Sequence, residues 1–203
     1  MRGPRDGRGL VVDPGDANHV FVELLNAGYY SSTDGGAHWA KLDSAPCSNC
    51  YSIDVKNNKE LLIGSESGVH RSADGGLSWT KTLDGFGFRV LYDPAVAGRA
   101  FAITGDGFFI SNDDGGSWTR QSTTPPGFLY EFAADAGQPG HLMLATTRGM
   151  MRSVDAGLTW QRTQTGVYGG YFLGLKALAN GAGQFALLGS SPAGPFVGSV
   201  SDV

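Results

Sequence analysis

The stretch STDGGAHW, residues 32–39, decides the fold because the chain repeats it, lightly edited, three more times. Each copy keeps Ser, Asp, Gly and Trp at one spacing, Ser-x-Asp-x-Gly-x-x-Trp, called the box below. All four tryptophans of the 203 residues stand in it, 40, 39 and 42 residues apart. Periods of this length are typical of propeller blades and other stacked repeats. The fixed positions are Ser32, Asp34, Gly36, Trp39, Ser72, Asp74, Gly76, Trp79, Ser111, Asp113, Gly115, Trp118, Ser153, Asp155, Gly157 and Trp160.

Three further apolar runs precede each box, separated by Gly, Pro, Asp or Asn turns. In the first period they are residues 10–12, 19–24 and 28–31, and a fourth run follows Trp39. Short runs bounded by such residues predict strands joined by tight turns. Four short antiparallel strands per period make one propeller blade. The sequence therefore predicts an all-β propeller with four complete blades and almost no helix.

A fifth period is incomplete. Its first three strands are expected at residues 171–175, 185–188 and 196–198, and the 203 residues contain no fifth complete box. Residues 1–8 are a poor outer strand because they contain Pro4 and two glycines. We therefore expect part of a larger ring, or an open arc that a second chain or a missing segment completes. Residues 1–8 are assigned as an N-terminal extension and 9–203 as a single propeller domain.

The box residues suit a tight turn. Its Asp can accept hydrogen bonds from backbone N–H groups, and its Gly reaches backbone angles that other residues adopt only at a cost. Its Trp begins the outermost strand and can bury a large apolar face against its own blade. As metal ligands, the four aspartates would lie on four different blades, and no blade repeats a second acidic residue at ligand spacing. We predict a structural role, with no metal and no cofactor.

Charge and composition exclude some partners. Fifteen basic and nineteen acidic residues give a formal net charge of -4, which creates no field to attract nucleic acid or an anionic membrane. We also find no apolar run long enough for a membrane helix, and the start MRGPRDGRGL lacks the apolar region of a signal peptide. A soluble globular protein is expected, with its compartment left open by these features.

The box pattern resembles the Asp-box, or BNR, repeat, and the resemblance to BNR-type β-propellers covers residues 9–203. It implies that the box lies between the third and fourth strands of a blade, at the periphery and away from the ligand-binding face. The same box occurs in sialidases, xyloglucan-cleaving glycosidases, sortilin-type receptors and photosystem II assembly factors. The resemblance therefore implies a fold without choosing among these functions.

Candidate binding residues lie in the loops opposite the boxes, between the fourth strand and the next first strand and between the second and third strands. Aromatic faces beside polar groups can stack on sugar rings or hold a peptide, although each ring alone could equally pack the core. We predict a non-catalytic module that binds a protein or a glycan at this rim. The candidates are Tyr51, Phe86, Phe88, Arg89, Phe128, Tyr130, Arg148, Tyr168 and Tyr171.

The alternative is a glycoside hydrolase, xyloglucanase-like or sialidase-like, or part of one. Its acid and base would come from carboxylates on the same rim. A sialidase also needs several arginines around the substrate carboxylate, and only Arg89 and Arg148 stand on suitable loops. The candidate carboxylates are Glu23, Glu66, Asp84, Asp106 and Glu131.

The two cysteines, Cys47 and Cys50, are close in sequence on this rim. No second Cys pair completes a zinc site, and no His follows for haem attachment. A local disulfide is the first interpretation, and two free thiols are the alternative. The resemblance and this pair favour a secreted or periplasmic protein.

Overall fold

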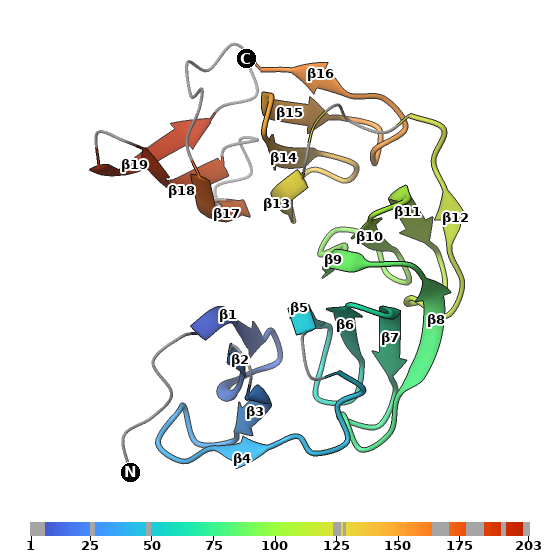
Figure 1. Ribbon diagram of the computed structural model, residues 1–203, viewed down its shortest axis with the longest axis vertical. Helices are drawn as coiled ribbons and strands as arrows, with labels where there is room; N and C mark the ends of the chain where they lie inside the picture. Colours follow the sequence, from blue (N-terminus) through green and yellow to red (C-terminus); the bar gives the residue numbers. More distant parts are fainter. Residues whose placement is uncertain are drawn as a thin grey trace. The chain divides into compact units, whose positions relative to one another are not determined.

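The computed structural model describes residues 7–24, 27–47, 50–123, 127, 129–163, 171–177, 185–191 and 194–200 (Figure 1). Strands and their connecting turns account for the described residues. Within them, no helix is long and apolar enough to cross a membrane.

The strands form five antiparallel sheets, each ordered as in the sequence. Blade 1 comprises β1 (Gly7–Asp13), β2 (Asp16–Leu24), β3 (Gly28–Ser32) and β4 (Ala40–Lys41). Blade 2 comprises β5 (Cys50–Val55), β6 (Leu61–Ser65), β7 (Gly68–Ser72) and β8 (Thr80–Asp84). Blade 3 comprises β9 (Gly87–Tyr92), β10 (Ala100–Thr104), β11 (Gly107–Ser111) and β12 (Thr119–Arg120). Blade 4 comprises β13 (Leu129–Ala134), β14 (Leu142–Thr146), β15 (Gly149–Ser153) and β16 (Gln161–Arg162).

The fifth sheet has three described strands, β17 (Tyr171–Ala177), β18 (Phe185–Ser191) and β19 (Gly194–Val200). The predicted fold class is confirmed: the chain is all-β, with four complete blades and a partial fifth. The first strand begins at Gly7, earlier than the apolar run at residues 10–12 indicated.

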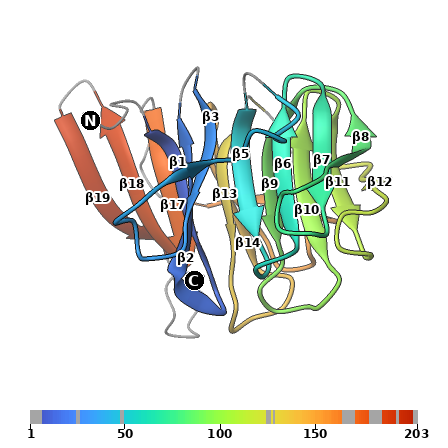
Figure 2. The ribbon, with the colours of Figure 1, turned by 90° about the horizontal axis from the view of Figure 1, so that it is seen from below.

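The chain divides into two compact units. One contains residues 1–92 and 98–119, and the other contains residues 93–97 and 120–203. Within the first unit, β1 contacts β5 and β5 contacts β9, so the first strands of successive blades are neighbours. Figure 2 shows β5, β6 and β7 of blade 2 beside β9, β10 and β11 of blade 3. Within the second unit, β13 contacts β17 in the same way.

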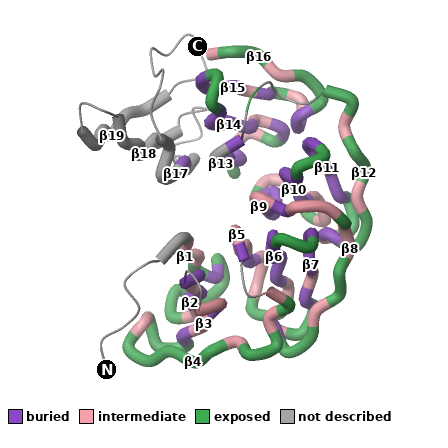
Figure 3. Tube along the Cα trace, in the orientation of Figure 1, coloured by how far each residue is buried: buried purple, intermediate pink, exposed green. Residues whose placement is uncertain are grey.

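The core lies on both faces of the middle strands. Strands β6, β10, β11 and β14 are buried at every position instead of alternating (Figure 3). A strand buried on both faces reads as a continuous apolar run, as these do. In the first unit, Leu61 of blade 2 packs with Phe21 of blade 1, while Leu62 packs with Ala102 of blade 3. Successive blades therefore share their apolar faces.

Each box closes the turn from third to fourth strand with the same hydrogen bonds. In blade 2, the Ser72 hydroxyl donates to Oδ1 of Asp74 at 2.8 Å and accepts from the Gly76 amide at 2.8 Å. Asp74 also accepts from Ser78, through the amide to Oδ1 at 2.9 Å and through the hydroxyl to Oδ2 at 2.6 Å. The equivalent partners of Asp34, Asp113 and Asp155 are His38, Ser117 and Thr159.

A second bond ties each box to the turn between the first two strands. The amide of the residue after the box Asp donates at 2.8–2.9 Å in all four blades, to a carbonyl of that turn in blades 2, 3 and 4 and to the carbonyl of Asn18, near the start of β2, in blade 1. This residue and the box Gly both have positive φ, for example Gly75 at 76° and Gly76 at 85°. The two turns of each blade therefore lie at one edge, as the sequence suggested for this rim.

The box tryptophans differ from expectation. Each Trp precedes the fourth strand, and Trp79 and Trp118 pack on the preceding blade as well as on their own. Trp118 of blade 3 packs on the cluster containing Leu62 and Val69 of blade 2, and its Nε1 donates to Oγ1 of Thr82 at 3.0 Å. The sequence did not show this because the contact joins residues one period apart.

Gly115→Ala should destabilise the protein by about 2 kcal/mol, measured by chemical denaturation. Gly115 has φ of 84°, where a Cβ costs on the order of 1–2 kcal/mol, and that Cβ would lie 2.6 Å from Cδ2 of Leu62. Gly105→Ala is the control, because its Cβ would meet only Phe86 at an ordinary 3.8 Å. Equal stability losses in both variants would contradict a conformational requirement at the box.

Acid should weaken the boxes. Hydrogen bonds from Ser78 lower the pKa of Asp74 from its ordinary 3.8 to about 2, and those from Ser117 do the same for Asp113. Because the folded-state pKa is the lower one, the stabilisation is present above pH 3.8 and is lost as pH falls towards 2. Thermal unfolding should show this decline, and Asp74→Asn should reduce its slope. Asp43→Asn, at an exposed carboxylate outside the boxes, should leave the slope unchanged.

Candidate functional site

The candidate site lies at the edge opposite the boxes. Because the strands are antiparallel, loops from the second to the third strand and from the fourth to the next first strand share this edge. Tyr51 is the second residue of β5, directly after Cys50, and Phe86 directly precedes β9. Both residues therefore lie where the sequence predicted ligand-binding loops.

Three of the predicted aromatic side chains form one cluster. The ring centroids of Tyr51 and Phe86 are 4.6 Å apart, and those of Phe86 and Phe88 are 4.7 Å apart. The ring planes are tilted by 38° and 51°. All three side chains are half-buried, so each keeps part of its surface accessible to a ligand. The cluster joins blades 2 and 3 within the first unit.

Arg89 bonds to the backbone that carries this cluster. Its Nη1 donates to the backbone carbonyls of Tyr51 at 2.5 Å and of Phe88 at 3.2 Å. The amide of Gly105, in the β10–β11 turn, donates to the carbonyl of Phe86 at 2.9 Å. Arg89 was predicted as a ligand-binding residue. In the structure its side chain hydrogen-bonds to the backbone of Tyr51 in blade 2 and of Phe88 in blade 3, the two segments that carry the aromatic rings.

Close backbone contact between blades 2 and 3 fixes the cluster further. A Cβ on Gly64 would lie 2.8 Å from the carbonyl oxygen of Gly87, so a larger residue does not fit there. The hydroxyl of Ser52 accepts from the Val90 amide at 3.1 Å. The carbonyl of Ser52 accepts from the buried Tyr29 hydroxyl of blade 1 at 2.8 Å. Ser52 thus links blades 1, 2 and 3 directly below the rim.

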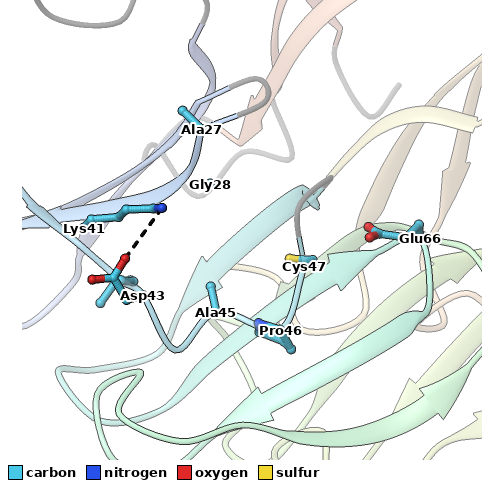
Figure 4. Close-up of a pocket in the computed structure, with 9 residues that line it drawn as sticks. Ala27, Gly28, Lys41, Asp43, Ala45, Pro46, Cys47 and Glu66 are labelled. Atoms are coloured by element: carbon cyan, nitrogen blue, oxygen red, sulfur yellow. Dashed lines mark ion pairs between the residues drawn. The ribbon is translucent and has the colours of Figure 1, made fainter.

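A pocket of about 530 Å³ opens on the same edge between blades 1 and 2. Figure 4 shows Lys41 and Asp43 on one side, where Nζ and Oδ1 are 3.6 Å apart, and Glu66 on the other. Sequence reasoning missed Lys41 and Asp43 because they follow the first box, on the outer strand and the loop after it. The lining residues are Ala27, Gly28, Lys41, Leu42, Asp43, Ala45, Pro46, Cys47 and Glu66.

Cys47 and Cys50 form a disulfide with their Cα atoms 5.6 Å apart. Cys50 is buried against Tyr29 and Ile63, while Cys47 is half-buried and lines the pocket. The disulfide therefore fixes the loop that leads from the pocket to Tyr51.

The predicted carboxylates differ in environment. Glu23 is buried, and Asp84 is exposed and paired with Nζ of Lys81 at 2.6 Å. Glu66 and Asp106 are exposed on turns, and Glu131 is half-buried on β13. Across the described residues, no three or more His, Cys, Asp or Glu side chains gather as a metal site.

The remaining candidates do not extend the cluster. Arg148 is exposed on the β14–β15 turn in the second unit, and its carbonyl accepts from Nη2 of Arg162 at 2.5 Å. Phe128 and Tyr168 lie outside the described residues. Tyr130 and Tyr171 stand on β13 and β17, and their side chains also lie outside what the structure describes.

The chain is similar in sequence to three characterised proteins, and no family model matches it. A xyloglucanase from Paenibacillus sp is 26% identical over 80% of this chain and 21% of its own length. A xyloglucanase from Hypocrea jecorina (strain QM6a) is 26% identical over 80% of this chain and 20% of its own length. Dispase autolysis-inducing protein from Streptomyces mobaraensis is 30% identical over 64% of this chain and 36% of its own length. The chain thus spans about a fifth of the xyloglucanases.

Solved structures show the same fold at lower identity. The GH74 xyloglucanase from Xanthomonas campestris has a TM-score of 0.80 at 16% identity, covering 98% of this chain and 36% of that one. YCF48 from Cyanidioschyzon merolae has a TM-score of 0.65 at 15% identity, covering 93% and 65%. YCF48 bound to D1 peptide has a TM-score of 0.60 at 18% identity, covering 95% and 69%. The same fold therefore occurs in a xyloglucanase and in YCF48, which has been solved with a bound peptide, so the fold alone does not determine the ligand.

Reduction of the Cys47–Cys50 disulfide should lower the free energy of unfolding by about 2 kcal/mol, the amount expected from closing so short a loop. The measurement is chemical denaturation with and without a reductant, with thiol titration to confirm reduction. The double variant Cys47→Ser with Cys50→Ala should show the lower stability under both conditions. If reductant changes the stability of this double variant, the disulfide is not the cause.

Proposed function

We propose that this chain, which belongs to the BNR-type β-propeller family, is a non-catalytic binding module that takes a polysaccharide at its aromatic rim. The observation that carries the proposal is the cluster of Tyr51, Phe86 and Phe88, partly accessible and backed by Arg89. Tilted rings fixed from below present apolar faces that sugar rings can contact without ordering new side chains.

The ligand class follows from the chemistry of this edge. Sugar rings combine apolar faces with hydroxyl groups, and the aromatic cluster adjoins loops that carry polar side chains. Glu66 and the Lys41–Asp43 pair supply exposed acceptors and a donor around the neighbouring pocket. The two xyloglucanases among the relatives make xyloglucan the first polysaccharide to test.

The carboxylates favour binding over hydrolysis. A glycosidase needs one carboxylic acid and one carboxylate on either side of the scissile bond. Glu23 is buried, and Lys81 holds the pKa of Asp84 below its ordinary value. Glu66, Asp106 and Glu131 remain as candidates for the alternative, a glycoside hydrolase or part of one, which the names of the relatives favour.

A second candidate ligand is a protein segment. YCF48 has been solved bound to D1 peptide, and this chain shares its fold. An exposed aromatic cluster can also hold apolar peptide side chains. In either case the disulfide favours a secreted or periplasmic setting, since such bonds persist in oxidising compartments.

Isothermal titration calorimetry of the 203-residue chain with xyloglucan oligosaccharides tests the proposal. Phe86→Ala should weaken binding about tenfold, because the loss of one stacked ring corresponds to roughly 1.4 kcal/mol. Tyr51→Phe should bind nearly as well, since it keeps the ring. Trp39→Ala is the matched control, because it removes an exposed aromatic side chain from the box edge.

The same samples separate the alternatives. If the chain releases reducing ends from the oligosaccharides, and Glu66→Gln or Asp106→Asn abolishes that release, the chain is a hydrolase and not a non-catalytic binding module. Binding of a peptide without binding of any polysaccharide would favour the second candidate. Equal losses in Phe86→Ala and Trp39→Ala would refute a site at the aromatic cluster.

A further inference from the structure

The turn between β10 and β11 lies directly against the segment that carries the aromatic cluster. The amide of Gly105 in this turn donates to the carbonyl of Phe86 at 2.9 Å. A Cβ on Gly105 would lie 3.8 Å from Cβ of Phe86, an ordinary van der Waals contact. A Cβ on Gly85, the residue before Phe86, would lie 2.8 Å from Oδ2 of Asp106. The Asp106 carboxylate therefore occupies the space that a side chain at residue 85 would fill, one residue away from Phe86.

The Asp106 side chain is accessible to a ligand. It is exposed, and within the described part of the chain its carboxylate forms no hydrogen bond and no ion pair. The two cations of the neighbouring segment, residues 81–89, are already engaged: Nζ of Lys81 is 2.6 Å from Oδ1 of Asp84, and Nη1 of Arg89 donates to two backbone carbonyls. An ionised carboxylate only accepts hydrogen bonds. Asp106 thus adds an acceptor and a negative charge to the aromatic site.

The turn does not require this carboxylate. The amide of Asp106 donates to Oγ1 of Thr104 at 3.0 Å. In blade 4, the amide of Arg148 donates to Oγ1 of Thr146 at 3.0 Å, and Arg148 likewise directly precedes the third strand. The same turn therefore carries a carboxylate in blade 3 and an exposed guanidinium in blade 4. The threonine hydroxyl determines the turn, and the fold accepts either charge.

The glycine that faces the turn is repeated as well. A Cβ on Gly127 would lie 3.2 Å from Cγ of Arg148, just as one on Gly85 would meet Asp106. The two glycines have φ of 100° and 101°, so the backbone has the same conformation in both blades. Each glycine directly precedes a phenylalanine in the sequence. Since this shared backbone requires neither charge, the charge at the position is a property of the ligand-binding edge.

Resting on the proposed polysaccharide binding, we propose that Asp106 is a specificity-determining residue of the aromatic site. Its carboxylate accepts hydrogen bonds from hydroxyl groups of a neutral sugar that contacts Phe86, and it repels a sugar that carries a carboxylate. Hydrogen bonds to an ionised acceptor are roughly twice as strong as bonds between neutral groups. Specificity also arises from charges that disfavour the wrong ligand. The site therefore takes neutral polysaccharides and discriminates against polymers of uronic acids.

Isothermal titration calorimetry with one ligand in two charge states tests the proposal. The ligands are xyloglucan oligosaccharides before and after oxidation of their primary hydroxyl groups to carboxylates. Wild type should bind the oxidised form about tenfold more weakly at low ionic strength, and salt should reduce this difference by screening exposed charges. Asp106→Asn should reduce the difference to about twofold, because it keeps an acceptor oxygen and loses the charge. Asp106→Arg should reverse the preference, and blade 4 shows that the turn accepts arginine.

Asp16→Asn is the matched control. Asp16 is exposed at the start of β2, on the box edge, and this substitution changes the net charge by the same amount. It should leave the tenfold difference intact, and the thermal midpoints of all three variants should stay close to that of wild type. The specificity role is overturned if wild type binds the oxidised form as well as the neutral one, if discrimination persists in both Asp106 variants, or if the control loses it equally. Polysaccharide binding itself would survive each of these results. Wild type that binds neither form would instead refute the proposed function, and the specificity role with it.

Discussion

The hydrogen bonds between the box Ser and Asp are the interaction on which the other features depend. In blade 3, the Ser111 hydroxyl donates to Asp113 at 2.7 Å and accepts from the Gly115 amide at 2.8 Å. This closes the turn after the third strand, and the following amide then reaches the carbonyl of Gly98. The turn sets where Trp118 leaves the blade. Because the Trp packs on the preceding blade, a local bond determines how neighbouring blades meet.

Contacts between blades vary although the boxes do not. Lys56 of blade 2 lies 2.8 Å from Oδ1 of Asp114 in the box of blade 3 and 3.0 Å from Glu60. Arg71 bonds Glu60 at 3.1 Å and donates to the carbonyl of Asp114 at 3.0 Å. In blade 1 the equivalent of Lys56 is Asp13, which faces His19 at 3.5 Å. Asp13 carries the opposite charge to Lys56. The ion pairs of Lys56 with Glu60 and Asp114 are therefore not repeated at the equivalent position of blade 1.

The candidate ligand site depends on the same packing at the opposite edge. Tyr51 and Phe86 belong to different blades, and their rings meet because Arg89 and the Gly64–Gly87 approach hold the two blades together. The boxes therefore support the candidate site from the opposite edge of the blades. A structural repeat at one edge leaves the loops at the other edge free to vary, which is why one fold serves different ligands.

Several features were determined by the sequence alone. Box spacing and apolar runs predicted four blades and a partial fifth, because the hydrogen bonds of a turn and the apolar run of a strand both lie within a short stretch of sequence. The spacing of Cys47 and Cys50 likewise indicated a local disulfide, with free thiols as the alternative. The role of Ser78 and its counterparts, as donors to the box Asp, could have been found from the recurring Ser or Thr before Trp.

Only the tertiary structure decided which side chains meet across blades. It grouped Tyr51, Phe86 and Phe88, gave Arg89 backbone carbonyls as partners, and placed Lys41 and Asp43 at a pocket. It also showed that Trp39 is exposed where Trp79 and Trp118 are partly covered. These contacts join residues about forty positions apart, and their geometry depends on how sheets pack. A pattern within one period carries no information about such packing, so the sequence determined the blades and the structure determined their surfaces.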